Sequence, residues 1–140
     1  MREPVMTVEE VSAFLAEVFP QIDGNFIVED VGPMSARVRM PMREEKLRPG
    51  GTVSGPAMFG LADCAFYVAV LAMIGREALT VTTNCSIDFM RKPAAEDMVA
   101  EVRLLKLGRV LAVGDVMLYS EGSDDPVARA SLTYSIPPTR

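Results

Sequence analysis

The sequence contains no histidine. Ser-His-Asp triads and Cys-His pairs are therefore excluded. The common zinc sites are excluded as well, because two cysteines without histidine cannot build one. Any acid–base catalysis must use a carboxylate, a lysine, a tyrosine or water. We expect neither a metal ion nor a redox cofactor.

Long apolar runs and a cysteine framework are also missing. The longest uninterrupted apolar run, residues 65–74, is far shorter than the roughly 18–20 residues that span a bilayer. The first residues lack the apolar segment of a signal peptide. Cys64 and Cys85 have no framework spacing, which fits reduced thiols. The net charge of -5 argues against a broad nucleic-acid surface. We expect a cytoplasmic protein that binds neither membranes nor nucleic acids.

The 140 residues that are present predict a single domain, residues 1–140, with a core over about residues 24–137. Near the N-terminus, Thr7 and Glu10 have the spacing of a capping box. Apolar residues at helical spacing follow, so we predict a short helix over about residues 7–19.

Most of the remaining chain has the alternating pattern of strands. Asp23 and Gly24 predict a turn before the first strand, and Gly108 predicts a tight hairpin. The predicted strands cover residues 26–31, 34–40, 80–90, 97–107, 109–120 and 127–136. Two strands before a long helix and four after it predict an α+β fold, with an antiparallel sheet around one central helix.

The most informative residue is Asp63, which lies in that long helix. The helix is predicted over residues 56–74, with Pro56 at its first position and Gly75 as its C-cap. Asp63 is its only ionisable carboxylate. A buried unpaired charge costs several kcal/mol, so such a residue is usually paired, protonated or catalytic. A structural acid that caps a loop or pairs with an arginine is the alternative.

The order of elements and three motifs resemble the hotdog fold, and more narrowly the PaaI-type acyl-CoA thioesterases. The family pattern is Asn-x-x-Gly-x-x-His-Gly-Gly followed by a helical Asp, and residues 48–56 and Asp63 stand at those positions. Residues 82–94 are similar to the family's next strand and Pro-Ala turn, and residues 107–112 to a later stretch. The resemblance covers about residues 26–136.

The resemblance implies hydrolysis of an acyl-CoA thioester to a carboxylic acid and CoA, with CoA as part of the substrate. Asp63 holds the position of the nucleophile or general base, and Gly55 that of the backbone N–H that polarises the carbonyl. A helix start carries partial positive charge, which suits an oxyanion. Thr82 aligns with a hydroxyl that orients the attacking water. Ser54 holds a position whose side chain, by the resemblance, would lie near the thioester carbonyl and sulfur.

The chain departs from the family pattern at two polar positions. Arg48 replaces the family's Asn, and Ser54 replaces its His. The missing His motivates a rival hypothesis, a non-catalytic hotdog protein that binds acyl-CoA or another small ligand. The family's sites lie between two subunits, so the resemblance also implies a homodimer or a dimer of dimers.

Several further residues are candidates for contacts with substrate. The predicted substrate-binding residues are Arg48, Met58, Thr83, Arg91, Lys92 and Arg109. The last three are candidates to hold the phosphates of CoA, although solvated strand ends explain them equally well. Met58, Phe59, Phe66 and Tyr67 are candidates to line an acyl pocket, or are plain core. Cys64 is conceivable as a nucleophile, but a buried thiol is favoured because no histidine exists to activate it.

Overall fold

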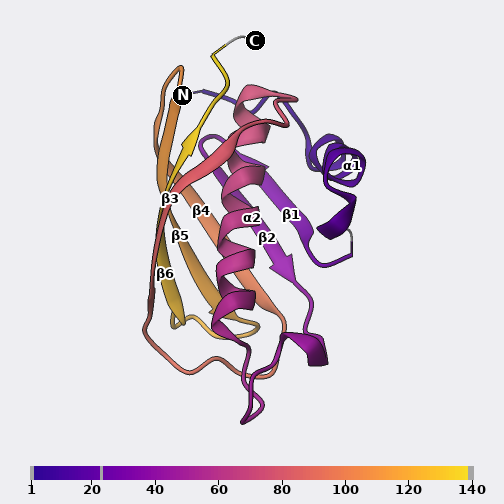
Figure 1. The fold of residues 1–140 in the computed structure, drawn as a ribbon, viewed down its shortest axis with the longest axis vertical. Helices are drawn as coiled ribbons and strands as arrows, with labels where there is room; N and C mark the ends of the chain where they lie inside the picture. The colour runs from indigo at the N-terminus through magenta and orange to yellow at the C-terminus, as the bar shows by residue number, and fades with distance from the viewer. Residues whose placement is uncertain (1, 23, 139–140) are drawn as a thin grey trace.

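The computed structural model describes residues 2–22 and 24–138 (Figure 1). Asp23, half of one predicted turn, lies outside the described residues. The elements are α1 (Val8–Val18), η1 (Pro20–Ile22), β1 (Ile27–Gly32), β2 (Ser35–Met40), η2 (Glu44–Lys46), α2 (Gly55–Ile74), β3 (Val81–Phe89), β4 (Met98–Leu107), β5 (Leu111–Ser120) and β6 (Ala128–Ser135). Every predicted helix and strand is therefore present. Within the described residues, the short 3-10 helices η1 and η2 are the elements that were not predicted.

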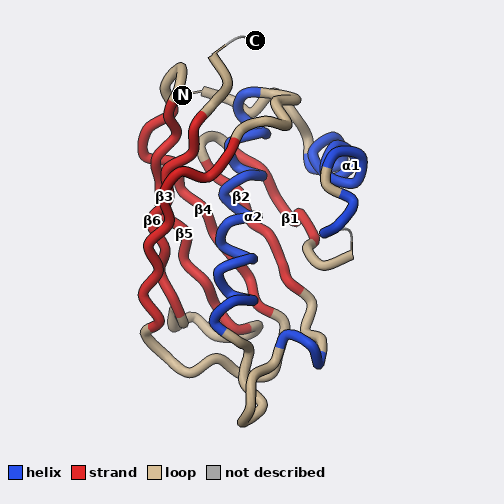
Figure 2. The backbone as a smooth tube through the Cα atoms, in the orientation of Figure 1, coloured by secondary structure: helices blue, strands red, loops and turns tan. Residues whose placement is uncertain are grey.

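The six strands form one antiparallel sheet in the order β1-β2-β4-β5-β6-β3. The sheet curves around α2, and α1 packs beside β1 on the far side of α2 from β3 and β6 (Figure 2). The prediction of an antiparallel sheet around one central helix is confirmed, and this is the hotdog fold. Its edges are β1 and β3, so each of these strands has one unpaired side.

The central helix α2 starts and stops where its sequence dictates. The Ser54 side chain caps the start by accepting a hydrogen bond from the Ala57 N–H. Gly55 is the first helical residue and Pro56 the second, one position later than predicted for the proline. Gly75, with a φ of 100°, ends the helix in a conformation that favours glycine.

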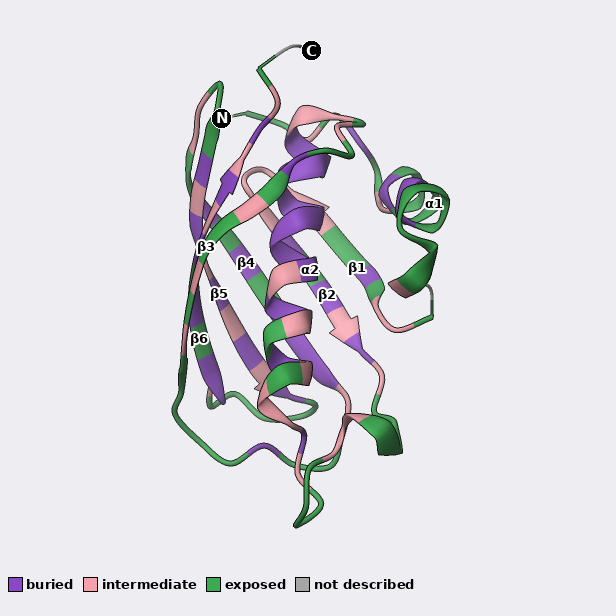
Figure 3. Cartoon of the chain, viewed as in Figure 1, coloured by how far each residue is buried: buried purple, intermediate pink, exposed green. Residues whose placement is uncertain are grey.

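Burial of α2 explains its composition. Thirteen of its side chains, all between Met58 and Met73, are buried. In Figure 3 the turns of α2 toward its C-terminal end are coloured as buried. Among the described residues α2 alone is long and apolar enough to cross a membrane, but 72% of its apolar window is buried inside the fold. It is therefore the core helix of the sheet, as an all-round apolar helix should be.

The short helix α1 is fixed at its start by the predicted capping box. The Glu10 N–H donates to the Thr7 hydroxyl at 3.1 Å, and the Thr7 N–H donates to the Glu10 carboxylate at 2.9 Å. The backbone hydrogen bond of Thr7 is the main reason why the pKa of Glu10 lies below its usual value. Val11, Phe14 and Leu15 form the buried face of α1.

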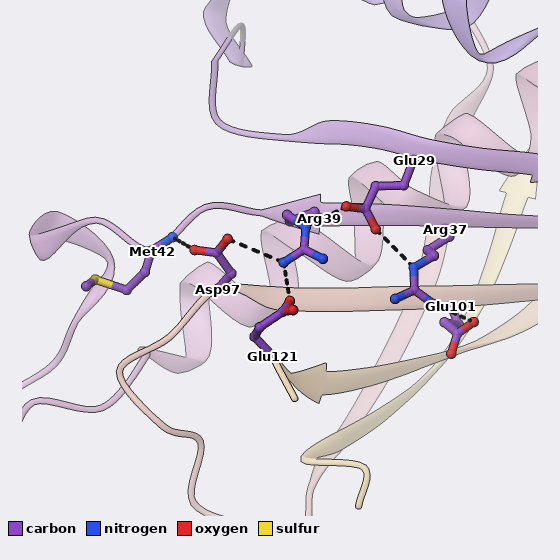
Figure 4. A network of polar contacts seen from close by, with 7 residues as sticks. All are labelled: Glu29, Arg37, Arg39, Met42, Asp97, Glu101 and Glu121. Atoms are coloured by element: carbon purple, nitrogen blue, oxygen red, sulfur yellow. Dashed lines mark hydrogen bonds and ion pairs between the residues drawn. The ribbon is translucent and has the colours of Figure 1, made fainter. Parts of the chain in front are cut away.

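The outer face of the sheet carries a network of ion pairs centred on Arg39 (Figure 4). Arg39 contacts the carboxylates of Glu29, Asp97 and Glu121, which come from three different parts of the chain. Arg37 pairs with Glu29 at 3.0 Å. These contacts tie β1 to β2 and link both to the end of the sheet at which β4 begins.

Candidate functional site

Asp63 lies in α2 with its side chain only half-buried, although its neighbours Ala62 and Cys64 are buried. Its carboxylate accepts two hydrogen bonds on the same oxygen. The Thr82 hydroxyl donates to Oδ1 at 2.6 Å, and the Tyr134 hydroxyl donates to Oδ1 at 2.7 Å. The structure thus brings together two predicted site residues, Asp63 and Thr82, and adds Tyr134.

A β-bulge explains why Thr82 faces the helix. The pairing of β3 with β6 shifts by one residue between Thr82 and Asn84. Thr82 therefore pairs with Tyr134, while Cys85, farther along β3, pairs with Leu132. Residues directly opposite each other share a face of the sheet. Because one extra residue reverses the alternation, Thr82 and Cys85 both lie on the inner face, which strict alternation would not allow.

Tyr134 is the site residue that the sequence analysis missed. It is 2% exposed on β6. Its ring packs 5.0 Å from the Phe66 ring and 6.2 Å from the Tyr67 ring, measured between centroids. The sequence does contain one indication of it, because Tyr134 places a hydroxyl group on a strand face that otherwise carries small or aliphatic residues. Burial, and next the charge of Asp63, raise the pKa of the Tyr134 phenol far above its usual value, so it stays a donor.

A cavity of about 720 Å³ opens beside this cluster. Its walls come from the end of α1 and the segment after it, from one stripe of α2, and from the segment that leads into β3. The lining residues are Val18, Phe19, Gln21, Ile22, Asn25, Phe26, Lys46, Gly60, Asp63, Cys64, Tyr67, Ala78, Thr80, Val81, Thr82 and Tyr134. Mostly apolar walls with one carboxylate are typical of a small-molecule site.

The start of α2 offers a second chemical group, a free backbone donor. Pro56 has no N–H, and Ser54 already accepts from the Ala57 N–H at 3.2 Å. Within the described ranges no group accepts a hydrogen bond from the Gly55 N–H. The sequence Ser-Gly-Pro-Ala therefore leaves Gly55 with an unpaired donor at the positive end of the helix.

Comparisons with known proteins now identify the family. Residues 50–127 match the thioesterase superfamily. The chain belongs to the thioesterase superfamily. A comparison with curated proteins gave no match. Membership supports thioester hydrolysis in general, and Asp63, Gly55 and Thr82 all lie within the matched residues.

Solved structures agree with this family. A protein from Silicibacter sp. TM1040, provisionally named a thioesterase, is 56% identical, with a TM-score of 0.91 over 97% of this chain and 95% of that one. A mutant of the phenylacetic acid degradation protein PaaI from Thermus thermophilus is 27% identical, with a TM-score of 0.71 over 83% and 97%. Zebrafish thioesterase superfamily member 2 is 20% identical and shares the fold, with a TM-score of 0.82 over 94% and 99%.

In this thioesterase-superfamily chain, only one of the candidate acyl-pocket residues lines the cavity. Tyr67 does so, and its hydroxyl donates to the Ala78 carbonyl at 2.9 Å. Met58 and Phe66 are buried in the core, at 4% and 0% exposure, instead of lining it. Phe59 is 40% exposed and outside the cavity. The sequence could not separate them, because α2 is apolar on nearly every side.

The predicted cations do not meet within one chain. Arg91 and Lys92 follow the end of β3, where Arg91 donates to the Pro126 carbonyl at 2.8 Å. Arg109 precedes β5, and the first residues of β5 and β3 both pair with Ser135 of β6. Arg109 therefore lies near the start of β3, whereas Arg91 and Lys92 lie beyond its end. Nine residues of strand, roughly 25–30 Å, separate these two ends. Arg48 lies in the exposed loop before α2.

The remaining candidates have structural partners or surroundings. Thr83 is the bulged residue, and its hydroxyl donates to the Thr133 carbonyl at 3.2 Å. Burial, and then the nearby charge of Asp63, raise the pKa of the Cys64 thiol to about 12, so Cys64 is no thiolate near neutral pH. Among the described residues no group of His, Cys, Asp and Glu side chains has the arrangement of a metal site.

Proposed function

We propose that this thioesterase-superfamily protein hydrolyses an acyl-CoA thioester to a carboxylic acid and free CoA. One observation carries the proposal above all: the Asp63 carboxylate lies on the wall of a largely apolar cavity and is held by two hydroxyl groups. The cavity would take the acyl group, and Asp63 would stand beside the thioester. The proposal needs no cofactor apart from the CoA of the substrate.

The proposed reaction uses Asp63 as a general base or as a nucleophile. As a base, Asp63 takes a proton from water while the water oxygen bonds to the thioester carbon. The carbonyl oxygen becomes an oxyanion, which the Gly55 N–H stabilises. The C–S bond then breaks, the carbonyl re-forms, and CoA leaves as a thiolate that needs little protonation. As a nucleophile, Asp63 would first form an anhydride that water hydrolyses.

The geometry favours a site shared between two chains. Asp63 and Gly55 are eight residues apart on α2, which corresponds to roughly 12 Å of helical rise. One chain therefore cannot easily bring both groups to the same carbonyl. We propose a homodimer, or a dimer of dimers, in which the helix start of one chain faces Asp63 of the other.

The edge of the sheet supports this arrangement. β3 has no partner on its outer side, and it exposes Val81 at 53% and Phe89 at 52%. An exposed edge with apolar side chains is a template for pairing with another strand. Antiparallel pairing of two β3 strands would bring Arg91 and Lys92 of one chain toward Arg109 of the other, where the phosphates of CoA could bind.

A panel of acyl-CoA thioesters, tested on the wild type and on Asp63→Asn, tests the function. We expect kcat to fall by at least about 100-fold, a typical cost of removing a positioned base. Binding of acyl-CoA without any hydrolysis that depends on Asp63 would contradict the enzyme and support the rival, a ligand-binding hotdog protein. The observation that favours this rival is Ser54, whose oxygen caps α2 at the position of the histidine in the family pattern that the sequence resembles.

The role of the Gly55 N–H has a clean test in Gly55→Pro. Proline suits the first helical position, and Ser54 has the extended ψ of 155° that a residue before proline adopts. The variant should therefore lose the donor, and circular dichroism must show that the helix is kept, because residue 55 itself precedes Pro56. Gly55→Ala is the matched control, because it keeps the N–H and its Cβ would lie 3.5 Å from the Phe89 ring, an ordinary contact.

The two variants together test whether the site is shared. A hybrid dimer of one Asp63→Asn chain and one Gly55→Pro chain would contain one intact shared site and one doubly damaged site. We expect the purified hybrid to regain about half of the wild-type rate, by counting intact sites. A hybrid as inactive as its parents would show that each site belongs to a single chain.

A further inference from the structure

The two oxygens of the Asp63 carboxylate have different surroundings. Oδ1 accepts hydrogen bonds from the Thr82 hydroxyl at 2.6 Å and from the Tyr134 hydroxyl at 2.7 Å. A carboxylate oxygen has about two lone-pair directions, so these donors saturate Oδ1. In the part of the chain that the structure describes, nothing donates to Oδ2. Oδ2 is thus the oxygen that is open to water or substrate.

Tyr134 is built to hold this orientation. Its single O–H proton is shared between Oδ1 at 2.7 Å and the main-chain oxygen of Asp63 at 2.8 Å, so the hydroxyl spans the residue from backbone to carboxylate. Its ring is fixed between β6 and α2 by the contact with Phe66. Thr82 approaches Oδ1 from the neighbouring strand, which leaves the carboxylate little freedom to rotate.

We infer that Tyr134 is a positioning residue for thioester hydrolysis: together with Thr82 it occupies Oδ1 and turns Oδ2 toward the reacting atoms. This inference rests on the proposed function of Asp63. It names the oxygen that receives the proton from water, or that attacks the thioester carbon. It also assigns a role to a β6 residue outside the part of the chain that matches the family.

Tyr134→Phe removes the donor and keeps the ring. We expect kcat to fall roughly 10- to 100-fold, the size of effect that a misplaced catalytic group produces, with KM changed less than about threefold. In an Asp63→Asn background the same substitution should cause no further loss, because Tyr134 acts through the carboxylate. A purely structural role would instead lower the rate by the same factor in both backgrounds.

Tyr119→Phe is the control for loss of a phenol hydroxyl. Tyr119 lies on the outer face of the sheet, beside Ser120 and Glu121, so kcat should stay at the wild-type value. If Tyr134→Phe does not fold, Thr82→Val on the exposed edge strand removes the other donor to Oδ1 and should lower kcat. Thr82→Ser keeps a hydroxyl donor at this position, so its kcat should return to the wild-type value.

The outcomes separate the inference from the proposed function. If Asp63→Asn hydrolyses as fast as the wild type, the proposed function fails. If Asp63→Asn is inactive but Tyr134→Phe and Thr82→Val keep the wild-type kcat, only the inference is overturned. A loss in Tyr134→Phe that is fully additive with Asp63→Asn would overturn it as well.

Discussion

Gly114 has the closest approach to neighbouring backbone of any glycine in the described chain, and we expect Gly114→Ala to destabilise the fold strongly. A Cβ at this position would overlap the Arg103 carbonyl oxygen, and it would lie 2.9 Å from the Leu104 Cα and 3.0 Å from the Phe66 ring. Two of these three atoms belong to the backbone of β4 and cannot rotate away. Relief therefore requires β4 and β5 to move apart.

The magnitude follows from what that movement breaks. Overpacking of a dense interior typically costs about 1–3 kcal/mol. Parting the strands beside the register shift between Leu104 and Lys106 would weaken about one or two ladder hydrogen bonds, each worth about 1 kcal/mol. We expect a loss of about 2–5 kcal/mol, which corresponds to roughly 10–15 °C in Tm for a domain of this size.

Thermal and urea unfolding, followed by circular dichroism, measure the effect, and Gly108→Ala is the matched control. Gly108 lies in the same hairpin, but its Cβ would lie 3.5 Å and 3.6 Å from its nearest neighbours, and its φ is not positive. Gly108→Ala should therefore leave Tm within a few degrees of the wild type. Equal Tm values for Gly114→Ala and the wild type would refute the argument that β4 is rigid here.

Two further predictions concern titration and thiol chemistry. Arg39, and to a lesser extent Arg37, hold the pKa of the Glu29 carboxyl below its usual 4.5, so the ionised Glu29 stabilises the fold above pH 4.5 and loses this effect as the pH falls through the lowered pKa. The difference in urea midpoint between the wild type and Glu29→Gln should therefore shrink from pH 7 to the acid range. A difference that does not change with pH would contradict this prediction. Burial, and then the charge of Asp63, raise the pKa of both thiols, that of Cys64 to about 12. Alkylation at pH 8, read by mass spectrometry, should label the half-buried Cys85 before the buried Cys64, because Cys85 is more accessible; equal rates in the folded protein would contradict this.

The fold was largely readable from the sequence because its signals are local. Thr7 and Glu10 specify the start of α1 through bonds three residues apart, and the structure contains both. Gly75 ends α2 as predicted, and Ser54, which was not predicted as a cap, starts α2 by capping chemistry that needs no distant partner either. The strands that were predicted from alternating patterns begin and end within two residues of the observed strands. Such local preferences predict the fold well because the tertiary structure stabilises the same helices and strands that the local sequence favours.

The site was less readable because it depends on register and topology. The bulge at Thr83 changes which face Thr82 occupies, yet an inserted residue leaves an alternating pattern on both sides of it. Tyr134 is 71 residues away from Asp63 along the chain, so no spacing connects them. The resemblance to a family identified Thr82 as a candidate site residue. The pairing of β3 with β6 explains why the Thr82 hydroxyl contacts the Asp63 carboxylate.

The open stripe of α2 links these observations to the proposed dimer. Phe59 and Gly60 are adjacent, and each lies three or four residues from both Pro56 and Asp63, so the four residues share one face of α2; none of them is fully buried. Six strands cover the rest of the helix but leave this stripe between the two sheet edges. A charged residue is tolerated on α2 because it lies on that stripe, where water or substrate can reach it. A helix this apolar is not expected to leave Phe59 in water, so the stripe is where we expect the second chain to pack and to bring its own Gly55 to Asp63.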